Sequence, residues 1–272
     1  QRRALSAMTG PLLTARPPAQ NWQPSRHQSA HAQPIGPPLP ATWAPPSPPV
    51  RQTLNGSSVA CVPLTLEHAP SLVNAFASSA AEHWAWLSWG PFETAAAHTE
   101  WVGKATLTAD PLFFALEVSG VARGVASFLR VDVPHGCIEI GHLSFSPALQ
   151  RTRAATEALY LLMRWAFEAG YRRVEWKCNA LNAASRRAAL RLGFTPEGVL
   201  RQHRITKGAS RNTAWFSVID SEWPTVKAAC EAWLDEGNFD GAGVQRRSLE
   251  SIRAAVEEHG RLPRKRERGA GE

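Results

Sequence analysis

The chain has 272 residues, 44% of them hydrophobic and 19% charged, which is enough for one large domain or two small ones with a substantial core. No run approaches the ~20 uncharged apolar residues that cross a bilayer, so we expect no membrane-spanning segment and no membrane partner. The four cysteines lie far apart and form no C-x-x-C pair. This spacing argues against a zinc knuckle or a disulfide-dense scaffold and favours reduced thiols in a cytoplasmic protein.

The formal net charge is +7, but the excess lies at the two ends of the chain. Residues 1–50 hold four arginines and no acidic residue, and residues 261–272 hold five basic and two acidic residues. Residues 51–260 are neutral, with 21 residues of each sign. A nucleic-acid-binding fold would concentrate basic residues on its folded surface. We therefore expect no nucleic-acid partner, apart from a polyanion contact that the basic tail could make in place of being simply solvated.

The N-terminal segment is predicted to be disordered. It holds 12 of the 21 prolines, scattered among Ser, Ala and Gln, and such a composition cannot bury enough apolar surface to offset the entropy of ordering. We assign residues 1–55 to this Pro-rich segment and residues 261–272 to a disordered basic tail.

From residue 59 onward, hydrophobic patterns and turn residues predict regular elements. In chain order they are a strand over 59–64, a helix over 67–77, a Trp-rich stretch over 84–92, a helical run reaching Trp101, a strand over 113–118, and strands over 124–133 and 137–145 joined as a hairpin by Pro134-His135-Gly136. Next come a helix whose apolar residues recur from Ala155 to Phe167, a strand over 174–178, a helix over 185–192, strands over 194–206 and 213–220, and helices over 225–235 and 248–258. This order indicates an α+β fold, with helices layered on a mixed sheet of about seven strands.

The stretch Gln150–Ala155 joins a strand to an amphipathic helix. N–H groups at a helix N-terminus lack internal partners and bind anions. Ala154 and Ala155 would let phosphates approach the backbone, and Arg151 and Arg153 would add cationic donors. The chemistry alone leaves two interpretations open: a site for a diphosphate-bearing ligand, or an ordinary capped helix with two solvated arginines.

Three motifs in order give this stretch a context. Gln150–Ala155 fits the pattern Gln/Arg-x-x-Gly-x-Gly/Ala, with Arg153 where the first Gly is usual. Ile138–His142 lies on the preceding strand, and Asn182–Ser185 leads to Leu192-Gly193-Phe194. In these motifs the chain resembles the GCN5-related N-acetyltransferase (GNAT) family, and within it the branch of the ribosomal-protein N-terminal acetyltransferases. The resemblance implies a GNAT domain over 56–224 with a centrally splayed sheet, and a C-terminal helical extension over 225–260.

The resemblance also implies a ligand and its binding residues. Acetyl-CoA, with no metal, would lie where the strands over 137–145 and 174–178 splay apart. Asn182 and Ser185 would hydrogen-bond its pantetheine and thiol end, with helix capping as their alternative role. The residues whose amides would cradle its pyrophosphate are Gln150, Arg151, Thr152, Arg153, Ala154 and Ala155.

The implied reaction is direct attack of a primary amine on the thioester, with a strand amide near 141–143 stabilising the oxyanion. Glu139, through a water, or His142 would take the proton. By strand alternation these two side chains point to opposite faces of the sheet. The general acid stays unassigned, because Ala189 stands where the family often has a Tyr. The acceptor is either a protein N-terminus or a small amine.

Five aromatic residues fall where the family builds its acceptor pocket, and could line that pocket or simply fill the core. They are Trp84, Trp86, Trp89, Phe92 and Trp101. The departures at Arg153 and Ala189 leave one alternative function, a catalytically weak CoA-binding interaction module of the same fold.

Overall fold

The computed structural model describes residues 27–28 and 34–259, and its contacts divide the chain into residues 1–43 and 44–272. In the first unit, β1 (His27–Gln28) pairs antiparallel with β2 (Pro34–Ile35). The disorder predicted for 1–55 and 261–272 falls mostly outside the described residues. No helix within the described ranges is long and apolar enough to cross a membrane.

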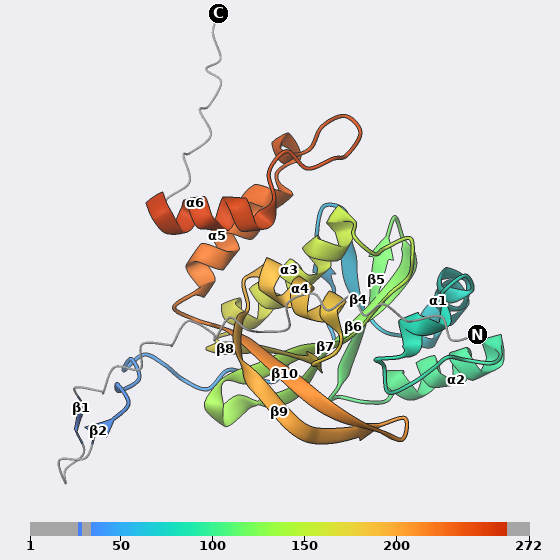
Figure 1. Ribbon diagram of the computed structural model, residues 1–272, viewed down its shortest axis with the longest axis horizontal. Helices are drawn as coiled ribbons and strands as arrows, with labels where there is room; N and C mark the ends of the chain where they lie inside the picture. Colours follow the sequence, from blue (N-terminus) through green and yellow to red (C-terminus); the bar gives the residue numbers. More distant parts are fainter. Residues whose placement is uncertain (1–26, 29–33, 260–272) are drawn as a thin grey trace, which may run out of the picture. The chain divides into compact units, whose positions relative to one another are not determined.

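The second unit is built on a mixed sheet of eight strands (Figure 1). The spatial order is β3-β4-β5-β6-β7-β8-β10-β9, and every neighbouring pair is antiparallel except β7 and β8. The predicted mixed sheet is thus confirmed, and it gains a short edge strand, β3, just before the expected domain start at 56. The strands are β3 (Leu54–Asn55), β4 (Ala60–Pro63), β5 (Leu112–Val118), β6 (Val121–Asp132), β7 (Cys137–Phe145), β8 (Arg173–Asn179), β9 (Thr195–Thr206) and β10 (Ala209–Ile219).

Six α-helices accompany this sheet in the described part of the chain. They are α1 (Ala69–Phe76), α2 (Ala95–Thr106), α3 (Arg153–Glu168), α4 (Ala183–Leu192), α5 (Trp223–Leu234) and α6 (Leu249–His259), and the short 3₁₀ turns are η1 (Leu66–His68), η2 (Ala81–Trp84), η3 (Val133–His135) and η4 (Glu236–Asn238). The helix predicted over 67–77 is divided between η1 and α1, because Pro70 stands at the start of α1 and has no N–H for a continuous helix.

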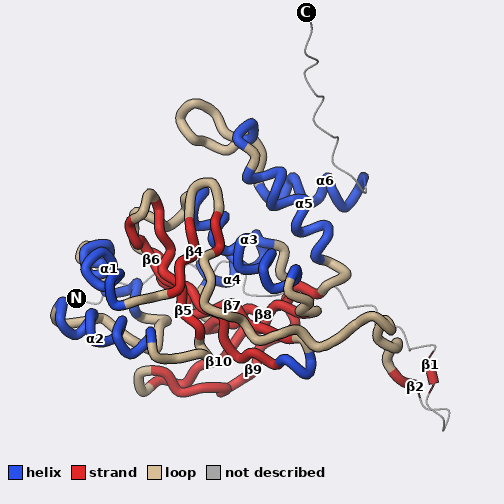
Figure 2. Tube along the Cα trace, turned by 180° about the vertical axis from the view of Figure 1, so that it is seen from behind, coloured by secondary structure: helices blue, strands red, loops and turns tan. Residues whose placement is uncertain are grey.

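The sheet separates two cores, because successive strand residues face opposite sides. On β5, Leu112 and Phe114 pack in the core that contains α3, α4 and α5, while Phe113 and Ala115 pack in a second core with α1 and α2. Figure 2 shows α1 and α2 beside β6, away from α3. Trp223 of α5 is buried in the first core, so the C-terminal helices pack against the fold rather than forming a separate unit.

The parallel pair β7–β8 separates along its length. Cys137, Ile138 and Glu139 pair with residues 173–175, and no pairing continues beyond Glu139. β7 nevertheless extends to Phe145 and β8 to Asn179. The facing edges therefore carry main-chain groups with no ladder partner, which a ligand can use. The sheet is splayed at its centre, as the resemblance implied.

A β-bulge at His142 corrects one expectation. Between the pairs Ser127–Gly141 and Val125–Ser144, β7 holds one residue more than β6, and His142 has a φ of 52°. Its ring packs against Phe113 and hydrogen-bonds Ser127, on the same face as Glu139. The prediction that Glu139 and His142 point to opposite faces is therefore wrong, because the extra residue resets the alternation.

Candidate active site

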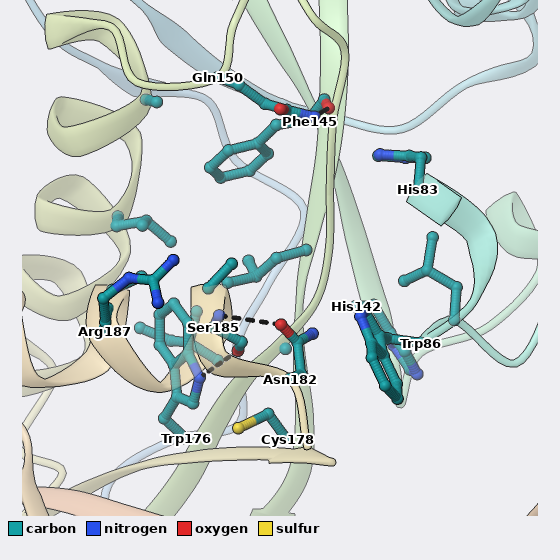
Figure 3. Close-up of a pocket in the computed structure, with 18 of the residues that line it drawn as sticks. His83, Trp86, His142, Phe145, Gln150, Trp176, Cys178, Asn182, Ser185 and Arg187 are labelled. Carbon is teal, nitrogen blue, oxygen red and sulfur yellow. Dashed lines mark hydrogen bonds between the residues drawn. The ribbon is translucent and has the colours of Figure 1, made fainter. Parts of the chain in front are cut away.

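The splay between β7 and β8 opens into a cavity of about 1840 Å³. Residues from both faces of the sheet line it, together with the start of α3, helix α4, the connection over 78–89 and the hairpin β9–β10. Figure 3 shows Gln150 and Phe145 at one end, Asn182 beside Ser185 and Trp176 at the other, and His142 with Trp86 across from them. The sequence-predicted residues from four separate segments thus meet around one cavity.

The turn before α3 presents main-chain donors. Gln150 closes it by donating its side-chain amide to the carbonyl of Phe145 at 2.8 Å. Thr152 caps the helix, and its hydroxyl accepts from the amide of Ala155 at 3.1 Å. In the described structure, the amides of Arg151, Arg153 and Ala154 have no acceptor. Three donors at the positive end of a 16-residue helix make an anion site.

The Arg153 side chain does not point into this turn. Its guanidinium donates to the carbonyl of Leu234 and lies 5.0 Å from the ring centroid of Phe239. The expectation of a second guanidinium donor beside the phosphates is therefore wrong for Arg153, although its main-chain N–H stays free. Arg153 has helical backbone angles, which a residue other than Gly adopts without strain. The absence of the usual Gly therefore causes no backbone strain here.

Asn182 and Ser185 hold the start of α4. The Asn182 side-chain oxygen accepts from the amide of Ser185 at 3.0 Å, and the Ser185 hydroxyl accepts from the indole of Trp176, also at 3.0 Å. The capping role is thus present in this geometry, and both residues also line the cavity. Cys178 lies beside them, and burial raises the pKa of its thiol.

Glu139 is buried, with 3% of its surface exposed, and two cations compensate its charge. Arg130 donates to the carboxylate at 2.6 Å and Lys177 lies 3.0 Å from the same oxygen. Lys177 is shared with Glu175 at 2.7 Å and lies 3.5 Å from the ring centroid of Trp215. Accepting a proton would weaken both ion pairs of Glu139, so this arrangement suits a structural anion better than a general base.

His142 lies on the same wall among aromatic rings. Its ring stacks on Phe113 at 5.1 Å, lies 5.1 Å from Trp89, and has Nδ1 2.9 Å from the hydroxyl of Ser127. Burial, with a smaller effect of the Arg130 charge, lowers the pKa of His142 to about 4. The imidazole is therefore neutral at pH 7 and is a weak proton acceptor.

Only two of the five predicted aromatic residues reach the cavity, Trp86 and Trp89. Trp84, Phe92 and Trp101 pack instead in the second core, around His98. These three residues therefore fill the core, which was the second of the two roles expected for the aromatic residues.

The cavity also contains side chains that the sequence interpretation did not select. His83 reaches it from η2 and has Nε2 2.9 Å from the hydroxyl of Ser144. His203, Arg204 and Arg211 reach it from the hairpin β9–β10. The two arginines are equally spaced about the turn at residues 207–208, a signal that could have predicted them to lie side by side.

Comparison with known proteins identifies the family. The family model described as an acetyltransferase (GNAT) domain matches residues 60–195. A GCN5-related N-acetyltransferase from Brucella melitensis is 43% identical, with a TM-score of 0.77 over 78% of this chain and 99% of that one. A probable GNAT-family acetyltransferase from Chromobacterium violaceum is 41% identical, with a TM-score of 0.66 over 71% and 99% of the two chains. No curated protein sequence matches.

More distant solved structures share the fold alone. One is RimL, a ribosomal L7/L12 alpha-N-protein acetyltransferase, at 20% identity and a TM-score of 0.55, covering 65% of this chain and 99% of that one. Another is the microcin C7 self-immunity acetyltransferase MccE, solved with acetyl-CoA and AMP, at 22% identity and a TM-score of 0.55 over 60% and 93% of the two chains. With the family match and the two closer likenesses, these findings show that the chain is an acyltransferase belonging to the GNAT family.

Proposed function

We propose that this protein transfers the acetyl group of acetyl-CoA to a primary amine, by direct attack of the amine within a ternary complex. One observation carries the proposal: Arg151 and Arg153, whose main-chain amides are unpartnered, line the same cavity as the unpaired edges of β7 and β8. A diphosphate joined to a long, amide-containing arm complements both features.

The residues present fit acetyl-CoA as the donor. The amides of Arg151, Arg153 and Ala154 would bind the pyrophosphate, and Ala155 leaves room at the cavity wall. Main-chain groups on the β7 edge would pair with the amides of the pantetheine arm as an added strand does. Arg187 of α4 faces the same cavity (Figure 3) and supplies a further cation.

The reaction centre would lie at the bulge in β7. The amine nitrogen attacks the thioester carbonyl, the carbon–sulfur bond breaks and the thiolate leaves, and the proton lost by the amine passes through solvent to that thiolate to give CoA. A main-chain N–H over 141–143 would stabilise the oxyanion, as donors preorganised in a cavity do. Since Glu139 is ion-paired and His142 is a weak base, the protein would act mainly by positioning an amine that is already neutral.

The acceptor would enter from the face opposite α3. The connection over 78–89 and the tip of β9–β10 meet there, because the Lys207 ammonium donates to the carbonyls of Trp84 at 2.8 Å and of Gly90. A protein N-terminus suits this site better than a lysine side chain. An α-amino group of pKa near 8 is about 10% neutral at pH 7, whereas a lysine is only about 0.04% neutral.

Two measurements test the proposal on the full chain. Calorimetry with CoA should give saturable binding, and CoA release from acetyl-CoA should depend on added amine across a panel of N-terminal peptides and small amines. Absence of binding at millimolar CoA would overturn the proposal. Binding without turnover across the whole panel would favour the alternative, a CoA-binding interaction module.

A further inference from the structure

The hairpin β9–β10 contributes an unbalanced group of cationic and polar side chains to the cavity wall. Arg204 and Arg211 are direct cross-strand partners, and His203 and Thr213 stand beside them. Like charges placed directly opposite each other on a sheet are destabilising. Arg204 is exposed to solvent whereas Arg211 is partly buried, so Arg211 is the member of the pair that gains most from a compensating anion.

Three buried polar atoms in this group have no hydrogen-bond partner: Nδ1 of His203, Nε of Arg211 and the hydroxyl of Thr213. Seven such atoms occur among the described residues, so almost half of them gather at this one wall. Buried polar groups in native proteins are nearly always paired, whether with protein, with ordered water or with a ligand. All three residues line the cavity, although these three atoms are themselves covered by protein.

Within the described ranges, no carboxylate lies within ion-pair distance of these arginines. Neither Arg204 nor Arg211 takes part in an ion pair. The acid of the neighbouring wall, Glu139, already pairs with Arg130 and Lys177. Burial is the largest cause that lowers the pKa of Arg211, and the charges of Arg130 and Arg204 add to it, whereas Cys178 and Glu139 raise this pKa.

This group of side chains is not part of the proposed pyrophosphate-binding site. On β10, Ala214 is buried in the core with α3, so the alternating residues Thr213 and Trp215 face the opposite side. Trp215 carries the ammonium of Lys177 on that side, and the ring of His203 lies 6.2 Å from it. Thr213, Trp215 and His203 therefore lie on the face by which the acceptor would enter.

We propose that Arg211, with His203, Thr213 and Arg204, forms a subsite for an anionic group on the acceptor, so that the substrate is a primary amine that also carries a carboxylate or a phosphate. This inference rests on the proposed acetyl transfer and specifies its acceptor. A guanidinium with free donors matches either oxyanion, and the hydroxyl and imidazole supply further donors.

The test compares acceptors in matched pairs, each an anionic amine and its neutral counterpart. The pairs are alanine and alaninamide for an α-carboxylate, the amidated peptides Ala-Asp and Ala-Asn for a side-chain carboxylate, and O-phosphoethanolamine and ethanolamine for a phosphate. For each pair, kcat/KM is measured with wild type, Arg211→Gln and Arg201→Gln. Arg201 lies on the same hairpin but does not line the cavity, so it controls for the loss of one positive charge.

We expect the anionic member of at least one pair to be preferred in wild type, and Arg211→Gln to reduce that preference about 10- to 100-fold, as loss of a charge-assisted hydrogen bond does. Arg201→Gln should leave the preference unchanged. The acceptor pair whose preference falls in Arg211→Gln shows whether the subsite binds an α-carboxylate, a side-chain carboxylate or a phosphate. An equal preference in wild type and Arg211→Gln, for all three pairs, would overturn the subsite.

A binding experiment separates failure of the subsite from failure of acetyl transfer. CoA-saturated protein is titrated calorimetrically with N-acetylglycine, N-acetylaspartate and inorganic phosphate, which requires no turnover. Binding of one of them to wild type that weakens at least tenfold in Arg211→Gln supports the subsite even if no amine is acetylated. Identical titrations of the two proteins would contradict it. Urea unfolding of Arg211→Gln should show undiminished stability, because the substitution removes repulsion from Arg204.

Discussion

In the proposed function, the two ends of the cavity would recognise their reactants by different means. The donor end would use the main-chain amides of Arg151, Arg153 and Ala154, which folding of one turn and one helix places together. The acceptor end is assembled from side chains of three segments that lie far apart in sequence, over 83–89, 139–142 and 203–213. The comparison teaches that a local motif can specify the donor, whereas the acceptor depends on tertiary contacts.

The largest expected effect is a loss of stability on acidification, because the acceptor side of the sheet holds two buried neutral histidines. His98, 5% exposed, and His142 both have pKa values of about 4, lowered chiefly by burial. The unfolded chain binds these protons near pH 6.5, so protons favour unfolding between pH 6.5 and 4. Stability should fall by about 4 kcal/mol from pH 6.5 to 4.5, as urea unfolding would measure.

A matched variant tests the origin of this loss. His98→Phe keeps a ring beside Phe92, with which His98 now stacks at 4.4 Å, and should halve the loss between pH 6.5 and 4.5. An equal loss of stability between pH 6.5 and 4.5 in His98→Phe and in wild type would show that the titrating groups lie elsewhere.

The next largest effect should follow substitution of Glu139, which we interpret as a structural anion. Glu139→Gln should lower the free energy of unfolding by about 2–3 kcal/mol. This is less than for a fully buried pair, because Lys177 keeps Glu175 and the Arg130 side chain is 47% exposed. Turnover of the folded variant should fall less than tenfold. A loss of kcat above a hundredfold with unchanged stability would show instead that Glu139 is the base.

A smaller effect should follow removal of one main-chain donor. Arg153→Pro deletes a single free N–H at the first position of α3, where proline suits the helix and the extended Thr152 suits a following proline. Affinity for CoA should fall about 10- to 50-fold, the worth of a hydrogen bond to a charged group. The control Arg153→Ala keeps the amide and loses only the contacts to Leu234 and Phe239. Equal affinities for the two variants would argue against the amide row.

The smallest expected effect is on the pH profile. Because His142 titrates near pH 4, it should produce no inflection in kcat/KM between pH 5.5 and 9. The rate should rise tenfold per pH unit and level off at the pKa of the acceptor amine. For two acceptors of different amine pKa, the rate should therefore level off at two different pH values. A single inflection shared by both, near pH 6–7, would identify a protein base instead.

The sequence predicts well what is encoded locally. The order of strands and helices and the turn before α3 follow from periodicity and capping residues within one segment. Asn182 as a helix cap follows from the same kind of pattern, since its oxygen needs only the amide three residues on. These features do not depend on how distant segments pack.

The rest depends on contacts that one segment cannot specify. The bulge at His142 is set by the register of β7 against β6, and strict alternation therefore gave the wrong face. The side chain of Arg153 follows a carbonyl 81 residues away, at Leu234. The turn at residues 207–208 indicates that Arg204 and Arg211 oppose each other, but their place at the cavity wall depends on how the hairpin packs.

The most direct test of the central claim is the amide spectrum of isotopically labelled protein during titration with CoA. We expect the N–H signals of Arg151, Arg153 and Ala154 to shift downfield more than those of the later residues of α3, as new hydrogen bonds to phosphate form. A saturating titration in which these three signals stay in place while others move would contradict it.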